Sequence, residues 1–335
     1  MPDKFTDVLS QALMVDKKKL STNSLQEFIS VMRRVLIENK KVVEETNRID
    51  QKNQNGFSID FQIIETILNN VEKESIRYGT VTISKYDANK KLIYGKEYLD
   101  AGLVVVCSDG NPYTLIELIL RNVLAGNTTI FVNEGYCYGT NHLLVELVNQ
   151  VLTQLDMPSL IYLWITENAE EVLSNFANIN LVVAIGSRNL QNRILAMSKT
   201  KCIVSGYENF DLYIEDKSHL DFIEKIREIN LPIQFYVKED LNLEIEDSIL
   251  VEDIEEAIAQ INYNGNHYAT SIFTSNENHA SKFIKEIKAS IVTVNTSPTI
   301  EHVLDINQKD LMIEKTVIYP ASYNLGIRNI FTEED

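Results

Sequence analysis

The sequence has 335 residues, of which 44% are hydrophobic and 24% charged, and these values are typical of a water-soluble globular protein of about two domains. Its formal net charge of −17 argues against nucleic acid and anionic membrane surfaces as partners, because both require clustered Lys and Arg. No apolar run approaches the roughly 18 residues of a membrane span, and Met1 to Thr6 does not resemble a secretory signal, so we expect a cytoplasmic protein that makes no use of a membrane.

The metal-ligating and redox residue types show no useful spacing. The three cysteines, Cys107, Cys137 and Cys202, form neither a CxxC pair nor an even disulfide set, which favours a reducing compartment. The five histidines show no HxxxH or HxxE spacing, so we expect no metal site; they are His142, His219, His267, His279 and His302.

The N-terminal part has helical periodicity. Ser24 and Glu27 form a plausible capping box before an apolar face at helical spacing. A polar break at 51–56 precedes a second predicted helix, which starts near Ser58 and ends before Gly79. Two amphipathic helices are therefore expected ahead of the first sheet.

Two short strand-like runs follow, Thr80 to Ser84 and Lys91 to Glu97, joined by polar residues typical of a turn. This pattern predicts a hairpin over residues 80–100. The hairpin either folds onto its own domain or extends as a ribbon.

The stretch from Leu103 to Val132 predicts the core of the fold. Leu103 to Cys107 is an apolar run without alternation, as in a strand buried on both faces of a parallel sheet. Pro112 marks the start of a helix and Gly126 its end, and Thr128 to Val132 is a second β-branched strand. One β-α-β crossover of this kind predicts a doubly wound, Rossmann-like α/β domain.

The alternation of strand and helix continues to residue 204 and resumes from His219, which predicts a second, smaller α/β domain. We place the domains at 1–215, 216–305 and 306–335, the last being a strand with an acidic tail. Neither a GxGxxG fingerprint nor a P-loop is present. The aromatic residues Tyr207, Phe210 and Tyr213 alternate along the predicted strands and are expected in the core.

Several segments in order resemble the aldehyde dehydrogenase superfamily, in particular its gamma-glutamyl phosphate reductase branch. They are KLIYGKEYLDAGLVVV (91–106), LAGNTT (124–129), AIGS (184–187), SGYENFDLYIED (205–216), VEDIEEAIAQIN (251–262) and TSIFTSNENHASKFIKEIKASIVTVN (270–295). The resemblance covers most of the chain after about Arg77. It implies the aldehyde-dehydrogenase-like fold, with a β-ribbon oligomerisation element at 80–100.

The resemblance also implies a cysteine nucleophile, in a loop after the first helix of the second domain. In this chain that helix ends near Ile229, and Leu231 and Pro232 lead directly into the next strand, so the loop is missing. Cys107 and Cys202 fall in predicted buried strands. Cys137, in the turn after Val132, is a weak candidate for a reactive thiol.

The cofactor positions that the resemblance implies are altered as well. Asn133 stands where the dehydrogenases carry a Lys for the cofactor ribose, and their general base falls at about Val204. Glu208 lies in the adjacent turn, where the family has a small residue. Gly186 and Ser187 match the turn beneath the cofactor pyrophosphate, although a Gly-Ser pair after a strand is also a common helix start.

Two hypotheses follow for the function. The first is a degenerate family member that has lost the chemistry, is expected to bind no cofactor, and acts as a binding or scaffolding protein. The alternative is an active oxidoreductase that uses NAD or NADP on aldehydes or acyl phosphates with a relocated nucleophile. In the family the ribbon and the terminal strand meet across a subunit boundary, so we expect a homodimer; its interface residues would include Val81, Ser84, Leu92, Tyr94, Val317 and Tyr319.

Overall fold

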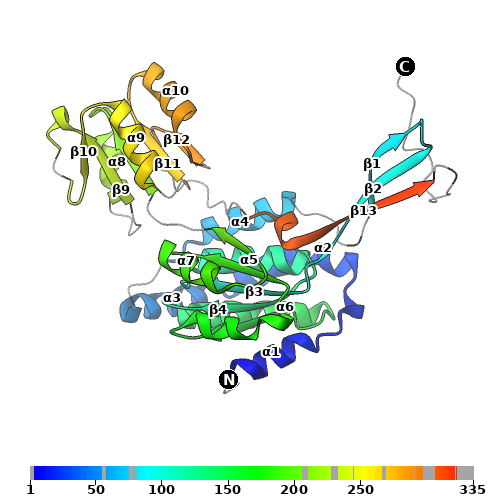
Figure 1. Cartoon of the computed structure of the whole chain (residues 1–335). Helices are drawn as coiled ribbons and strands as arrows, with labels where there is room; N and C mark the ends of the chain where they lie inside the picture. The colour runs from blue at the N-terminus through cyan, green and yellow to red at the C-terminus, as the bar shows by residue number, and fades with distance from the viewer. Residues whose placement is uncertain are drawn as a thin grey trace.

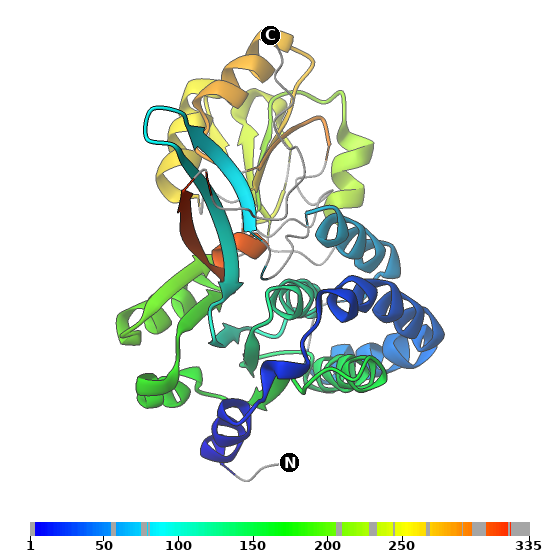
Figure 2. The same cartoon turned by 90° about the vertical axis from the view of Figure 1, so that its right-hand side faces the viewer.

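The computed structural model describes residues 4–54, 58–74, 79, 81–205, 210–227, 233–243, 245–265, 269–289, 291–296, 306–320 and 322. Its strands form three sheets, two parallel and one antiparallel. Figures 1 and 2 show the two parallel sheets with their helices as separate bodies, and the antiparallel sheet as a ribbon that projects from them.

The first parallel sheet has the order β5-β4-β3-β6-β7. Its strands are β3 (Leu103–Ser108), β4 (Thr128–Asn133), β5 (Ile161–Ile165), β6 (Leu181–Ile185) and β7 (Lys201–Ser205). They alternate with α5 (Pro112–Leu124), α6 (Tyr138–Gln154), the 3-10 helix η2 (Ala169–Asn178) and α7 (Arg188–Met197). This confirms the predicted doubly wound domain.

Both faces of this sheet are covered, which explains why β3 shows no polar alternation. Val104 and Val106 pack in one core cluster, against α5, α6, α2 (Thr22–Glu38) and α4 (Phe61–Glu74). Val105 and Cys107 pack in the opposite cluster, against η2, α7 and α1 (Phe5–Leu13). The remaining N-terminal helices are α3 (Lys40–Gln54) and the 3-10 turn η1 (Lys17–Lys19).

The second parallel sheet has the order β10-β9-β8-β11-β12. Its elements are β8 (Phe210–Ile214), α8 (Leu220–Arg227), β9 (Ile233–Lys238), η3 (Glu239–Leu241), β10 (Ile249–Val251), α9 (Ile254–Asn264), β11 (Ala269–Phe273), α10 (Glu277–Glu286) and β12 (Ile291–Val294). β8 is its central strand, so a boundary at residue 215 separates β8 from its own sheet. Strand pairing instead divides the chain between Ser205 and Phe210.

The third sheet is the ribbon, with β2 (Leu92–Asp100) between β1 (Val81–Asp87) and β13 (Met312–Pro320), antiparallel to both. A short 3-10 helix, η4 (Gln308–Leu311), precedes β13. The terminal strand therefore pairs with the hairpin inside one chain, where Val317 stands opposite Gly95. This corrects the expectation that the two elements meet only across a subunit boundary.

Candidate functional site

The carboxyl edge of the first sheet is where the sequence places the cofactor, and its topology agrees with that position. The chain goes from β3 to β4 and β5 on one side, then crosses to β6 and β7 on the other. In open α/β sheets, ligands bind at the point where the strand order reverses. Here that point lies between β3 and β6, next to Asp109 and Gly186.

Gly186 and Ser187, which the resemblance relates to a pyrophosphate turn, lie at this point. Gly186 has φ +129°, and the Ser187 hydroxyl caps α7 by accepting the Leu190 N–H at 3.2 Å. The Asp109 carboxylate packs directly against the glycine, since a Cβ on Gly186 would stand 2.7 Å from Asp109 Oδ2. A negative charge therefore sits over the turn that would otherwise receive a pyrophosphate.

Asn133 is at the edge but turned into the protein. Its side chain is 1% exposed, its Nδ2 donates to the Tyr136 carbonyl at 3.0 Å, and its Oδ1 accepts from Asn141. Asn141 also donates to the Gly110 carbonyl at 2.9 Å. Asn133 thus joins the loops after β3 and β4 through its buried side chain.

A carboxylate from a distant helix fills the N-terminus of α6. Asp50, on α3, accepts the N–H groups of Gly139 at 3.2 Å and Thr140 at 2.7 Å, together with the Thr140 hydroxyl at 2.6 Å. A helix N-terminus is the usual anion-binding feature of such folds. Because Asp50 supplies the anion from within the chain, this end of α6 is closed to an anionic ligand.

An ion pair crosses the same edge. Glu134, directly after β4, accepts from Arg193 Nη2 on α7 at 2.6 Å and from the Ala169 N–H at 2.9 Å. Both side chains of the pair are half-buried. The strand end, η2 and α7 are therefore held together by a charged side chain at the place where a cofactor would enter.

Cys137 lies inside the protein. It precedes α6 in a left-handed conformation with φ +55°, it is 0% exposed, and its Sγ is 3.9 Å from Asn47 Nδ2. Burial raises the pKa of Cys107 and of Cys202. A nucleophilic cysteine needs an accessible thiolate, which none of these surroundings favours.

The sequence contains no cysteine after Cys202, so the second domain has none. The junction between α8 and β9, residues 228–232, and the turn with Gly206, Tyr207 and Glu208 lie outside the described residues, as do His267 and His302. In the described ranges, no three His, Cys, Asp or Glu side chains gather as a metal site. The described helices also include none that is long and apolar enough to span a membrane.

Comparisons with known proteins agree with this geometry. Residues 248–306 match the model of the aldehyde dehydrogenase family. Gamma-glutamyl phosphate reductase of Clostridium perfringens is 23% identical over 327 residues, covering 78% of each chain, and that of Clostridium acetobutylicum is 21% identical, covering 84% of each.

Solved structures share the fold. Gamma-glutamyl phosphate reductase of Thermotoga maritima superimposes with a TM-score of 0.64 at 16% identity, covering 98% of this chain and 100% of that one. Glyceraldehyde-3-phosphate dehydrogenase of Methanocaldococcus jannaschii, complexed with NADP, gives a TM-score of 0.74 at 11% identity, covering 94% of each. The chain therefore shares the fold of these two enzymes, one of which was solved with NADP.

Proposed function

We propose that this chain, whose relatives and fold support the aldehyde dehydrogenase superfamily in the branch of the gamma-glutamyl phosphate reductases, is a non-catalytic member. It would act as a binding or scaffolding protein and bind neither NAD nor NADP. The observation that carries the proposal is the Asp109 carboxylate packed against Gly186.

The electrostatics of that contact oppose a dinucleotide. Two like unit charges 4 Å apart repel by about 4 kcal/mol in a partly buried site with an effective dielectric constant near 20. A pyrophosphate over Gly186 would meet this repulsion from Asp109. No lysine follows β4 to offset it, because Asn133 occupies that position.

The nucleophile is the second support. Reduction of an acyl phosphate by this family requires an accessible thiolate. Cys137 is fully buried, Cys107 lies in the core of the first sheet, and burial raises the pKa of the partly buried Cys202. The alternative of a relocated nucleophile therefore has no cysteine suited to it among the described residues.

The ribbon suggests how the protein assembles. Its apolar side chains include Tyr86 at 45% exposure and Ile313 and Ile318 at 53% each. β1 and β13 are both edge strands of a thin sheet that has little core of its own. Exposed strand edges and apolar groups favour pairing with a second copy, so the proposal includes a homodimer formed through this ribbon.

Calorimetric titration and thermal unfolding with millimolar NADPH and NAD test the cofactor proposal. A ligand present at 100 times its Kd adds about 2.7 kcal/mol of stability, which is easily detected. We expect no shift for this chain; the positive control is glyceraldehyde-3-phosphate dehydrogenase of Methanocaldococcus jannaschii, whose structure was solved with NADP. Saturable NADPH binding, or NADPH oxidation with an acyl phosphate, would contradict the proposal.

Light scattering coupled to size exclusion tests the assembly. Ile313→Lys and Ile318→Lys place charges on the ribbon and should convert a dimer to a monomer. Ile284→Lys on α10 is the matched control, because Ile284 is also 53% exposed but lies in the second domain. A monomeric wild type, or equal effects of all three substitutions, would exclude the ribbon as the interface.

A further inference from the structure

The carboxyl edge of the second sheet has the same topology as the first and is a separate place in the molecule. The chain runs from β8 to β9 and β10 on one side, then to β11 and β12 on the other, so the strand order reverses between β8 and β11. Only residues 206–209 separate Ser205, the last residue of β7, from Phe210, so the amino end of β8 is the end close to the first sheet. Glu215 follows the carboxyl end of β8 and lies at the opposite edge of the second sheet.

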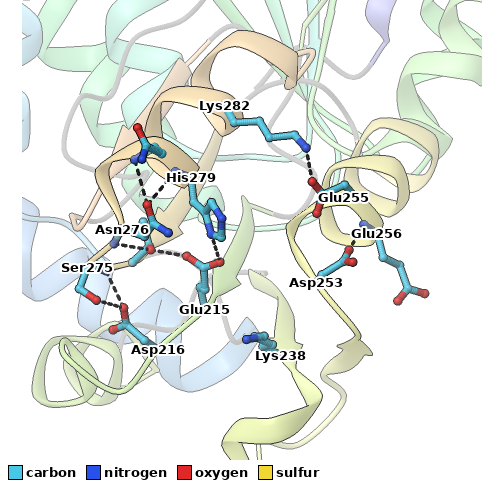
Figure 3. A network of polar contacts seen from close by, with 12 residues as sticks. Glu215, Asp216, Lys238, Asp253, Glu255, Glu256, Ser275, Asn276, His279 and Lys282 are labelled. Atoms are coloured by element: carbon cyan, nitrogen blue, oxygen red, sulfur yellow. Dashed lines mark hydrogen bonds and ion pairs between the residues drawn. The ribbon is translucent and has the colours of Figure 1, made fainter.

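A histidine and a glutamate meet at this reversal point (Figure 3). His279 Nδ1, on α10, lies 2.5 Å from Glu215 Oε1, and Glu215 Oε2 accepts the Thr274 hydroxyl. The Glu215 side chain is 9% exposed, whereas that of His279 is 40% exposed. Nδ1 faces the Glu215 carboxylate, so Nε2 is the ring nitrogen left for another contact.

The adjoining turn is rigidly held. Asp216 Oδ2 accepts the N–H and hydroxyl of Ser275 at 2.5 and 2.6 Å, and its Oδ1 accepts from Ser218. Burial alone would raise the pKa of Asp216, but the hydrogen bonds from Ser218 and Ser275 outweigh it and lower the pKa to about 2. The carboxylate therefore remains ionised and fixes the loops after β8 and β11.

Tyr213, on β8 two residues before Glu215, provides an independent indication of a ligand. Its side chain is 0% exposed, and its hydroxyl has no hydrogen-bond partner in the described structure. The Tyr213 ring stacks on Phe283 of α10, one helical turn after His279, with the ring centroids 6.3 Å apart. Burial raises the pKa of Tyr213, and the carboxylates of Glu215 and Asp253 raise it further. A buried hydroxyl without a partner is destabilising, and a ligand group can recover that cost.

The surrounding charge is mainly negative. Figure 3 places Asp253, Glu255 and Glu256 across from Glu215 and His279. The two lysines drawn there are engaged, since Lys282 pairs with Glu255, and Lys238 pairs with Asp240 at 3.0 Å. An anionic ligand would be repelled here, while a cation would be attracted.

We propose that this edge binds the primary ammonium group of a small organic amine, held beside His279 by the Glu215 carboxylate and the Tyr213 hydroxyl. An ammonium has a positive charge and only donors, which match a carboxylate and a hydroxyl oxygen that accept. A divalent metal ion fits less well, because the described residues contain no group of three ligands for one. The inference is independent of the proposed function, since the cofactor edge is on the other sheet.

Calorimetric titration with 1,4-diaminobutane tests the site at constant ionic strength, with 1,4-butanediol and MgCl2 as comparison solutes. We expect saturable binding of the diamine alone. Glu215→Gln should weaken it at least tenfold, and Tyr213→Phe should weaken it severalfold without loss of fold, because the aromatic ring is retained. Glu146→Gln on α6 removes an equally negative, 58% exposed carboxylate and should leave the affinity unchanged.

Three outcomes would overturn the proposal. They are no saturable diamine binding, equal losses in Glu215→Gln and Glu146→Gln, and equal responses to MgCl2 and the diamine. If Glu215→Gln does not fold, the Tyr213→Phe variant decides. Unchanged diamine affinity in Tyr213→Phe would also overturn the proposal. Failure of the cofactor proposal would be seen in the NADPH titration instead, so the two failures are distinguishable.

Discussion

The two parallel sheets have the same strand order but finish their carboxyl edges differently. In each, the first strand ends in a carboxylate, Asp109 after β3 and Glu215 after β8, and the helix after the fourth strand begins with a side-chain cap. In the first sheet the loops after β3 and β4 pack backbone to backbone, and the buried Asn133 and half-buried Glu134 side chains join them to α6 and α7. In the second, side chains span the loops and leave His279 at the surface. Identical topology therefore predicts where a site can be and not whether it is open.

Close backbone contact between the loops after β3 and β4 fills the carboxyl edge of the first sheet. Gly110→Ala should disrupt this contact and cause the largest expected loss in the free energy of unfolding. Gly110 has φ +96°, and an added Cβ would stand 2.1 Å from the Tyr136 carbonyl oxygen. Because neither backbone can retreat cheaply, we expect a loss of more than about 3 kcal/mol in the free energy of unfolding. Thermal and urea unfolding would measure it.

Gly79→Ala is the matched control for that substitution. Gly79 also has positive φ, +64°, but nothing lies within 4 Å of its added Cβ. The strain alone should cost about 1 kcal/mol. Equal losses at the two positions would show that φ, and not the packing of the loops after β3 and β4, determines the cost.

The central strands also differ, since β3 contains no charged residue whereas β8 buries Asp211, 3% exposed, in its second position. Burial raises the pKa of Asp211 to about 7, although a hydrogen bond with Tyr236 works in the opposite direction. A carboxyl with a raised folded-state pKa contributes its full stability below the unfolded value, about 3.9, and that contribution is lost as the pH rises through about 7.

Asp211→Asn should therefore stabilise the protein at pH 8.5 and have little effect at pH 4. At about 1.4 kcal/mol for each unit of pKa displacement, the rise from about 3.9 to about 7 corresponds to a gain of at most about 4 kcal/mol. Unfolding of both proteins across this pH range would test the sign. A variant less stable than wild type at pH 8.5 would mean that the Tyr236 contact outweighs the cost of burying the charge.

Much of the fold could be predicted from local signals. The apolar run of β3, Pro112 at the start of α5 and the β-branched residues of β4 each act over a few residues, and the crossover follows from them. Local reasoning is less reliable at helix starts: Ser21, not Ser24, caps α2, and Ser24 donates its N–H to the Ser21 hydroxyl at 3.1 Å. Which sheet receives β8 depends on long-range pairing, so the boundary at 215 was wrong.

The candidate sites were less predictable because their contacts are distant in sequence. Gly186 and Ser187 form the strand-to-helix turn that a local pattern indicates, but the inward orientation of Asn133 depends on Asn141 in the next helix. Asp50 reaches Thr140 across 90 residues, and His279 meets Glu215 across 64. Tyr213 is a core residue as predicted, yet its unpartnered hydroxyl cannot be inferred from alternation.

The smallest expected loss of stability concerns the helix caps, since each carboxyl edge has one, Ser187 on α7 and Asn276 on α10. Ser187 accepts one N–H, from Leu190, whereas Asn276 accepts two, from Asn278 at 3.0 Å and His279 at 3.3 Å. Ser187→Ala and Asn276→Ala should each cost about 1 kcal/mol, and replacement by Gly only a few tenths. Because Asn276 also orients the first turn of α10, which carries His279, its loss should weaken diamine binding as well as stability, whereas Ser187→Ala should lower stability alone. Urea unfolding and calorimetric titration of both variants would separate these effects. Equal diamine affinities in the two would show that the α10 cap serves only the helix, and that the two edges differ less than their exposed side chains suggest.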